Sequence, residues 1–139
     1  MGLEIWEQMK ALNVKIDAVF GCVGGGGLIS GVSTYLKSKD PSIKVYACSA
    51  RKTPAMYECL KAGEIITIPP TQPSVADGNG GNLEKGSITF DIFKKNVEEI
   101  ILVEEEDIKQ ATRHFVEVER TIVEPTAAVA LAGYMRRAK

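Results

Sequence analysis

Four consecutive glycines, Gly24 to Gly27, are the residues of this chain whose type and position point most directly to chemistry. They follow a short apolar run at residues 17–23 and precede an amphipathic stretch that begins at Leu28. A strand, a glycine turn and a helix in this order are typical of an anion site, because glycines let backbone N–H groups approach a phosphate and the helix dipole presents its positive end. The pattern predicts a phosphate site. A tight turn that needs positive φ is the alternative interpretation.

A dinucleotide site is a second hypothesis for the same loop. Gly25, Gly27 and Gly31 form a loose version of the dinucleotide-binding glycine pattern, but Ser30 stands where the strict pattern has its third glycine. Arg51 and Lys52 follow the next apolar strand, at the position from which basic side chains bind the 2′-phosphate of NADP. In this interpretation the chain is an NADP-binding Rossmann-like module.

The elements that must position this loop alternate regularly along the chain. We expect helices at residues 3–12, 28–39, 53–62, 87–96, 104–119 and 124–137, and strands at residues 18–22, 44–49 and 99–103. Residues 64–86 are rich in Pro, Gly and Asn, and predict a long loop of the kind that is usually functional or disordered. The alternation predicts a single α/β domain over residues 1–139 with three layers (αβα), in which helices cover both faces of a short, mainly parallel sheet.

Composition excludes several classes of protein. Hydrophobic residues make up 45% of the 139 residues and charged residues 25%, as in an ordinary globular chain rather than a disordered one. A net charge of −1 without a basic block argues against nucleic acid and anionic membranes as partners, and no apolar stretch is long enough to span a membrane. The spacing of Cys22, Cys48, Cys59 and the single His114 fits no zinc pattern, and three thiols in apolar surroundings predict a reduced, cytoplasmic protein.

Several motifs occur together and in a fixed order. The clearest are V-G-G-G-G-L-I-S-G at residues 23–31, S-V-A-D-G at 74–78 and E-P-T-A-A-V-A at 124–130; residues 54–63, 86–90 and 103–108 add further segments. This series resembles the pyridoxal-phosphate enzymes of the tryptophan synthase β-like fold, and within them the threonine/serine dehydratase and serine racemase branch. The similarity covers nearly the whole chain, and several ordered motifs are far more specific than the glycines alone.

The resemblance implies pyridoxal 5′-phosphate as the cofactor of the parent protein and a small amino acid as its substrate. The implied parent is a lyase that eliminates ammonia from serine or threonine and leaves a 2-oxo acid, or a racemase. The residues that the resemblance assigns to the cofactor are Gly24, Gly25, Gly26, Gly27, Leu28, Asp77, Gly78 and Glu124. For Asp77 a turn cap beside Gly78 is the alternative role, and for Glu124 an acidic residue at a helix start.

Parts of the family pattern have no counterpart in this chain. The resemblance places the lysine that forms the Schiff base upstream of the glycine loop, and the lysines Lys10, Lys15, Lys37 and Lys39 lie in no matching context. The resemblance also places the last strand of the family pattern after the helix expected at residues 124–137, past residue 139. We therefore expect no catalytic residue and a fragment-like domain, the C-terminal part of the cofactor-binding domain, that is inactive alone. Carboxylates that bind a cation in some relatives correspond to Ser49 and Ala55, so we expect no such metal site.

Two further expectations concern partners. A three-stranded sheet has unpaired edges, which favour a homo-oligomer. Leu3, Ile5 and Trp6 are the expected contact residues, because no earlier element is available to pack on their helix. A non-catalytic interaction domain that keeps the fold without the chemistry is the third hypothesis for the function.

Overall fold

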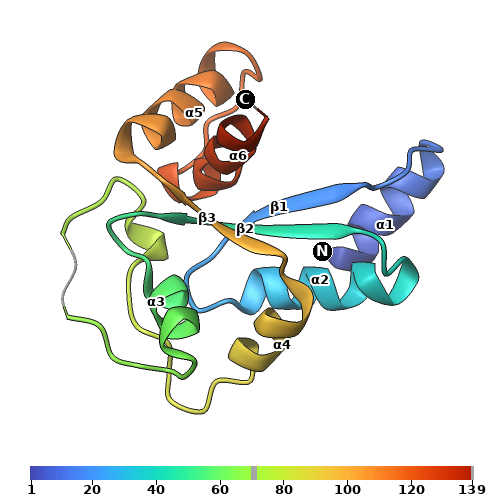
Figure 1. The fold of residues 1–139 in the computed structure, drawn as a ribbon. Coiled ribbons are helices and arrows are strands. Elements are labelled where there is room, and N and C mark those ends of the chain that lie inside the picture. The colour runs from blue at the N-terminus through green and yellow to red at the C-terminus, as the bar shows by residue number, and fades with distance from the viewer. Residues whose placement is uncertain (70–71, 139) are drawn as a thin grey trace.

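The computed structural model describes residues 1–69 and 72–138, and within them the chain alternates between helices and strands (Figure 1). In chain order the elements are α1 (Gly2–Ala11), β1 (Ala18–Cys22), α2 (Gly27–Lys39), β2 (Lys44–Ala50), α3 (Ala55–Ala62), the short 3-10 turn η1 (Asp77–Asn79), α4 (Thr89–Asn96), β3 (Glu99–Val103), α5 (Glu105–Glu117) and α6 (Pro125–Arg137).

The three strands form one parallel sheet in the order β1-β2-β3. The central strand β2 pairs with both neighbours, Cys22 of β1 standing opposite Cys48 and Val103 of β3 opposite Ala50. Every residue of β2 after Lys44 is buried, as expected for a parallel strand covered on both faces.

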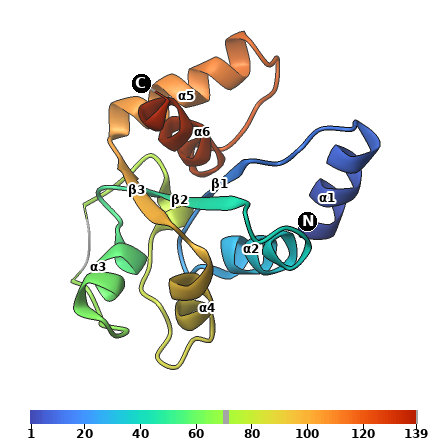
Figure 2. The same cartoon turned by 45° about the vertical axis from the view of Figure 1, so that its right-hand side comes forward.

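Helices cover both faces of the sheet, so the predicted three-layer α/β fold is confirmed. Alternate residues of β2 serve the two sides: Tyr46 and Cys48 pack with the helices α5 and α6, whereas Val45 and Ala47 pack with side chains of α2, α3 and α4. Figures 1 and 2 show α5 and α6 together on one side of the sheet and α2, α3 and α4 on the other.

The first helix is packed more closely than the sequence predicted. Gly2 is buried, and a Cβ added to it would lie 2.9 Å from Cβ of Tyr35 on α2. Ile5 and Trp6 pack against the buried residues of α2. Helix α2, which follows α1 in the chain, therefore covers part of this helix, while Leu3 stays half-exposed, at 52%. Self-association through α1 stays a prediction.

Element boundaries differ from the prediction mainly where the chain forms turns before a helix. Helix α3 starts at Ala55 rather than residue 53, because the N–H of Thr53 bonds to Ala50 O in a turn that follows β2. Helix α4 starts at Thr89 rather than residue 87, because Ser87 N–H closes a turn onto Glu84 O. The predicted loop at residues 64–86 has no helix or strand in its described part except η1, and Pro70 and Thr71 lie outside the described residues.

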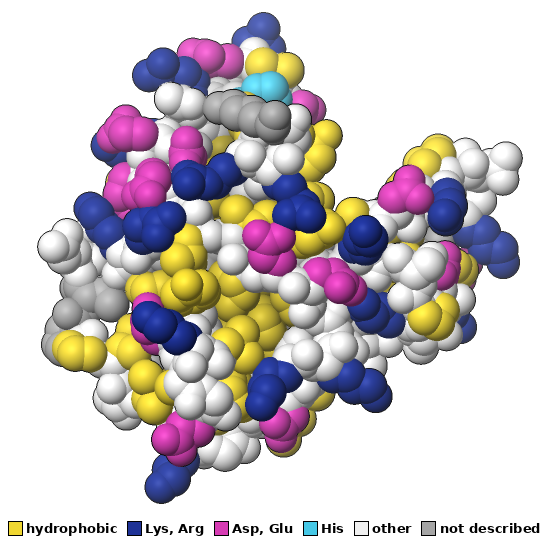
Figure 3. Space-filling model, in the orientation of Figure 1, with side chains coloured by type: hydrophobic (Ala, Val, Ile, Leu, Met, Phe, Trp, Pro, Cys, Tyr) yellow, Lys and Arg dark blue, Asp and Glu magenta, His cyan; other side chains and the backbone are white. Residues whose placement is uncertain are grey.

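The outer edges of β1 and β3 pair with no other strand in the described part of the chain. In Figure 3, hydrophobic side chains gather over β3 and between α3 and α4, where a groove is lined by Leu60, Phe93, Val97 and Ile100, among others. Self-association through these edges stays a prediction. Across residues 1–69 and 72–138, every helix is too short or too polar to cross a bilayer.

Replacing two helical glycines by alanine should change the free energy of unfolding in opposite directions. Gly133 of α6 lies directly on Cys48 of β2, and a Cβ added there would overlap Sγ and lie 3.0 Å from Cβ of that cysteine. We expect Gly133→Ala to lower the free energy of unfolding by about 1–3 kcal/mol through overpacking. Gly31 of α2 has open space around an added Cβ, so Gly31→Ala should raise the same quantity by about 0.5–1 kcal/mol.

Denaturant unfolding of the two variants beside the parent chain measures both values. Equal effects of the two substitutions would contradict the close packing of α6 on β2.

Candidate functional site

The glycine loop joins β1 to α2 at the carboxyl edge of the parallel sheet, which is where open α/β sheets bind ligands. Gly26 has φ +83° and ψ −3°, the left-handed conformation that glycine adopts without strain, and it is the N-cap of α2. A Cβ at Gly26 would lie 2.6 Å from Cε of Met56 and 3.4 Å from Cβ of Thr89. This glycine is therefore required by its backbone conformation, and the end of the Met56 side chain would have to shift to admit a Cβ.

The backbone N–H groups of this loop are free. Among residues 1–69 and 72–138, the amides of Gly24, Gly25, Gly26, Gly27 and Leu28 donate to no protein acceptor, whereas the amide of Ser30 already bonds to Gly26 O at 3.0 Å. Gly25, Gly27 and Leu28 are exposed to solvent, and added Cβ atoms at Gly25 and Gly27 would meet open space. The loop thus offers consecutive donors at the positive end of the 13-residue helix α2, the arrangement that receives an anion.

The start of α4 holds the glycine loop in place. Thr89 donates its hydroxyl hydrogen to Gly25 O at 2.7 Å, and Ser30 donates its own to Thr89 O at 3.3 Å. The hydroxyl of Ser87 lies 2.7 Å from that of Thr89. Thr89 was not among the site residues expected from the sequence, where its only signal was a hydroxyl residue at the start of the helix after the long loop.

The turn η1 closes the other side of the loop. A Cβ added to Gly24 would lie 3.6 Å from the carbonyl oxygen of Asn79 and 3.7 Å from its Cα, so the backbone of η1 lies directly beside the first glycine. The N–H of Gly78 donates to Oγ1 of Thr126, at the start of α6, at 3.1 Å. Gly78 must be a glycine there, because an added Cβ would lie 2.8 Å from that oxygen.

The structure brings the remaining predicted site residues to the same edge with exposed side chains. Asp77 is exposed and opens η1, where its carbonyl oxygen accepts the N–H of Gly80 at 2.8 Å. Glu124 is exposed, and its carbonyl oxygen accepts the N–H of Ala127 at the start of α6. Burial raises the pKa of the Cys22 thiol at the end of β1, and the carboxylate of Glu124 raises it further.

A carboxylate on α5 fixes the segment that leads into η1. Glu105 accepts hydrogen bonds from Ser74 Oγ at 2.6 Å and from Val75 N at 2.9 Å, and Lys52 Nζ lies 3.9 Å away. Burial alone would raise the pKa of Glu105, but the bonds from Ser74 and Val75, with Lys52 and Lys109 nearby, bring this pKa below its ordinary value. Glu105 was not singled out from the sequence; it lies at the start of the helix that was expected at residues 104–119.

The pairing of Arg51 and Lys52 argues against the dinucleotide hypothesis. Arg51 forms a hydrogen-bonded ion pair with Glu104, and Lys52 donates to Pro73 O at 3.1 Å beside Glu105. Both cations are therefore engaged with groups of the chain itself, which does not favour a 2′-phosphate as their partner.

The positions that correspond to the cation carboxylates are buried at the end of β2 and at the start of α3. Ser49 donates its hydroxyl hydrogen to Thr53 O at 3.4 Å, and Ala55 is 2% exposed. Within residues 1–69 and 72–138, no cluster of three or more His, Cys, Asp or Glu side chains is arranged to hold a metal ion.

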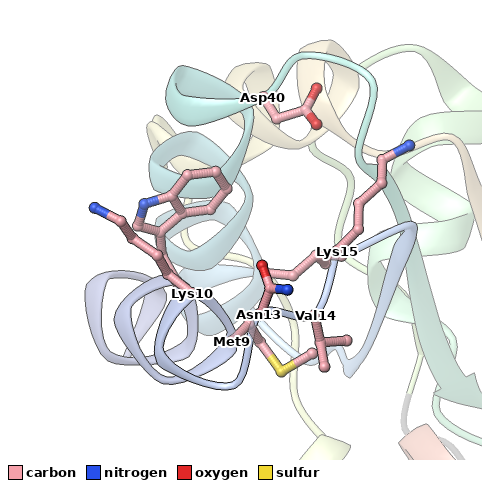
Figure 4. Close-up of a pocket in the computed structure, with 8 residues that line it drawn as sticks. Met9, Lys10, Asn13, Val14, Lys15 and Asp40 are labelled. Carbon is pink, nitrogen blue, oxygen red and sulfur yellow. The ribbon is translucent and has the colours of Figure 1, made fainter.

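A separate hollow of about 320 Å³ lies at the opposite, amino-terminal edge of the sheet (Figure 4). It lies between α1, the segment that leads into β1 and the end of α2, with Trp6, Asn13, Lys15 and Asp40 among its lining residues. The glycine loop contributes nothing to it, so this hollow is not part of the candidate site.

Comparison with known proteins gives a consistent result. The family model described as pyridoxal-phosphate dependent enzyme matches residues 1–139. The chain is 39% identical over 136 residues to serine racemase of Dictyostelium discoideum, covering 97% of this chain and 40% of that protein. It is 38% identical over 134 residues to a biosynthetic L-threonine dehydratase of Halalkalibacterium halodurans, covering 96% of this chain and 31% of that protein. The chain thus spans less than half the length of these relatives.

Solved structures show the same likeness. The crystal structure of T.th. threonine deaminase matches with a TM-score of 0.91 at 32% identity, over 99% of this chain and 49% of that one. Serine racemase from Dictyostelium discoideum matches with a TM-score of 0.84 at 36% identity, over 99% of this chain and 42% of that one.

Glu105 gives the site a testable pH dependence. Because the pKa of its carboxyl is lower in the folded state, its bonds stabilise the fold above the unfolded pKa of about 4.5, and this stabilisation is lost as pH falls through the folded pKa. Glu105→Gln should lower the free energy of unfolding most at pH 7, and the difference from the parent should shrink below about pH 4.5.

Unfolding measured from pH 7 to pH 3 provides the test. Glu106→Gln is the matched control, because this exposed neighbour pairs with Lys109 one helical turn away and should change little. A difference in the free energy of unfolding between Glu105→Gln and the parent that is constant at all pH values would rule out stabilisation by the ionised carboxylate of Glu105.

Proposed function

The chain belongs to the family of pyridoxal-phosphate dependent enzymes, and we propose that its glycine loop holds the phosphate of that cofactor. The observation that supports this most strongly is the row of free amides from Gly24 to Leu28 at the start of α2. A phosphate placed there would receive several N–H groups and the positive end of the helix dipole at once. The residues present therefore fit the group, because the loop has donors, space and no side chain in the way.

The proposal assigns distinct tasks to the residues around the loop. Gly24, Gly25, Gly26, Gly27 and Leu28 bind the phosphate through their backbone amides. Thr89 keeps Gly25 O turned toward α4, which leaves the amides facing outward. Asp77, Gly78 and Glu124, on η1 and at the start of α6, border the space beside the loop, where the cofactor ring would lie.

Pyridoxal phosphate, when bound, supplies an electron sink for reactions at the α-carbon of an amino acid. The parent activity that we propose is that of a threonine/serine dehydratase, with a racemase as the alternative within the same family. Relatives named serine racemase and L-threonine dehydratase support a small amino acid as the substrate. We propose that the residues of this chain bind and orient the cofactor. The reaction itself is proposed to need segments of the parent protein that have no counterpart in this chain.

Gly25 offers a clean test of the phosphate site. Its φ is not in the left-handed region, and an added Cβ meets nothing within 4 Å, so Gly25→Val should fold as stably as the parent. The valine methyl groups would nevertheless cover the free amides. We expect pyridoxal phosphate to raise the melting temperature of the parent chain progressively with ligand concentration, as a ligand that binds only the folded state does, and to leave that of Gly25→Val unchanged.

Gly31→Ala, outside the loop on the same helix, is the matched control and should respond to the ligand as the parent does. Equal stabilisation of Gly25→Val and the parent by pyridoxal phosphate would show that the ligand binds elsewhere. Stabilisation by NADP alone would favour the rival hypothesis. Gly26 is a poorer position for the test, because a side chain there would strain the fold itself.

A second prediction concerns turnover. With added pyridoxal phosphate, the 139-residue chain alone should release no 2-oxo acid or ammonia from L-serine or L-threonine, because no lysine lies in a context that matches the Schiff-base motif. A coupled assay for the 2-oxo acid measures this. Steady ammonia release, or one specific lysine carrying the cofactor after borohydride reduction, would contradict it.

A further inference from the structure

One buried side chain beside the glycine loop lacks a hydrogen-bond partner. Asn79, the last residue of η1, is 2% exposed, and its Nδ2 is shielded from solvent without an acceptor in the described part of the chain. A buried amide donor that stays unpaired destabilises a fold, and in native structures such a group usually has a partner that the protein alone does not supply. The sequence resemblance assigned no role to this residue.

The position of Asn79 suggests what that partner is. Its carbonyl oxygen and Cα lie 3.6 and 3.7 Å from where a Cβ of Gly24 would be, so Asn79 adjoins the first of the free amides. Two contacts hold η1 in this place: Gly78 bonds to Thr126, and the preceding segment bonds to Glu105. The residue that carries the orphan donor is therefore a neighbour of the free backbone donors, and both contacts hold it there.

The cations near the loop are already paired, so a neutral side-chain donor can add to the binding of an anion there. Arg51 and Lys52, the cations that follow β2, are paired with Glu104 and Glu105. An anion in the glycine loop would depend on backbone N–H groups and the dipole of α2 for its stabilisation. A side-chain amide adds a donor whose strength increases when the acceptor is ionised.

We infer that Nδ2 of Asn79 donates a hydrogen bond to a phosphate oxygen of the ligand in the glycine loop. Asn79 is then a binding residue that makes the site selective for a phosphate. This inference rests on the proposed function, because it needs an anion at Gly24 to Leu28.

The test compares Asn79→Leu with Thr53→Val in the full 139-residue chain. Leucine keeps the size of asparagine without its donor, and Asn79 does not have a positive φ that would forbid it. Thr53 Oγ1 is the other buried side-chain atom without a partner in the described residues, so Thr53→Val removes an orphan group that the inference does not place at the loop. The probes are inorganic phosphate, pyridoxal phosphate and pyridoxal without phosphate, with dissociation constants from calorimetry and melting temperatures without ligand.

We expect Asn79→Leu to weaken binding of both inorganic phosphate and pyridoxal phosphate by about tenfold or more, while its melting temperature without ligand is no lower than that of the parent. Thr53→Val should leave both dissociation constants unchanged. If Asn79→Leu does not fold, Asn79→Asp decides: it keeps the shape, replaces the donor by an acceptor and should lose phosphate binding.

Three results would overturn the inference. Unchanged affinities in a folded Asn79→Leu or Asn79→Asp would show that the amide serves only an ordered water. Weaker binding of pyridoxal phosphate and pyridoxal, with inorganic phosphate unaffected, would assign the amide to the ring instead. Equal losses in Thr53→Val would reveal a general packing effect. Failure of the parent chain to bind any of the probes would instead refute the proposed function, which separates the two claims.

Discussion

The arrangement of this chain depends on one strand that is paired on both sides and buried on both faces. Because β2 bonds to β1 and to β3 in parallel, all three strands end at the same edge of the sheet. The pairing continues past the strand ends, where Val23 N bonds to Cys48 O and Arg51 N to Val103 O. The glycine loop after β1 and the start of α5 after β3 are thus fixed relative to the end of β2. A parallel sheet covered by helices leaves this edge as the natural place for a ligand.

Segments distant in the sequence complete the loop. The four glycines supply conformational freedom and free amides, but their position is set by Thr89 on α4, by the backbone of Asn79 and, through Gly78, by Thr126 on α6. One of these hydrogen bonds joins two residues that are 64 positions apart in the sequence, and another joins two that are 48 positions apart. The anion site is therefore a product of the tertiary fold, although its donors belong to five consecutive residues.

Local patterns explain what could be predicted from the sequence. The apolar runs of β1 and β3 were predicted with their observed bounds, and β2 extends one residue further. The glycine run correctly indicated a strand-to-helix turn. The resemblance to the pyridoxal-phosphate family is confirmed by the family match and by the relatives. Its assignment of Asp77 and Glu124 to the cofactor stays a prediction.

What the sequence could not supply depends on long-range pairing. Arg51 and Lys52 looked available for a phosphate because their partners, Glu104 and Glu105, reach them only when β3 pairs with β2. The helix that was expected from residue 87 starts two residues later, and Thr89 uses its hydroxyl on the glycine loop. Asn79 carries no signal in a loop rich in glycine and asparagine; only its burial without a partner distinguishes it.

The central claim is that free backbone amides in the glycine loop bind a phosphate. Amide chemical shifts of a ¹⁵N-labelled chain, recorded during a titration with inorganic phosphate, test it most directly. We predict that the resonances of Gly24, Gly25, Gly26, Gly27 and Leu28 move together along one saturating curve, while those of Gly63 and Gly31 stay in place. Shifts confined to Arg51 and Lys52, or saturating shifts elsewhere with the glycine amides unmoved, would contradict it.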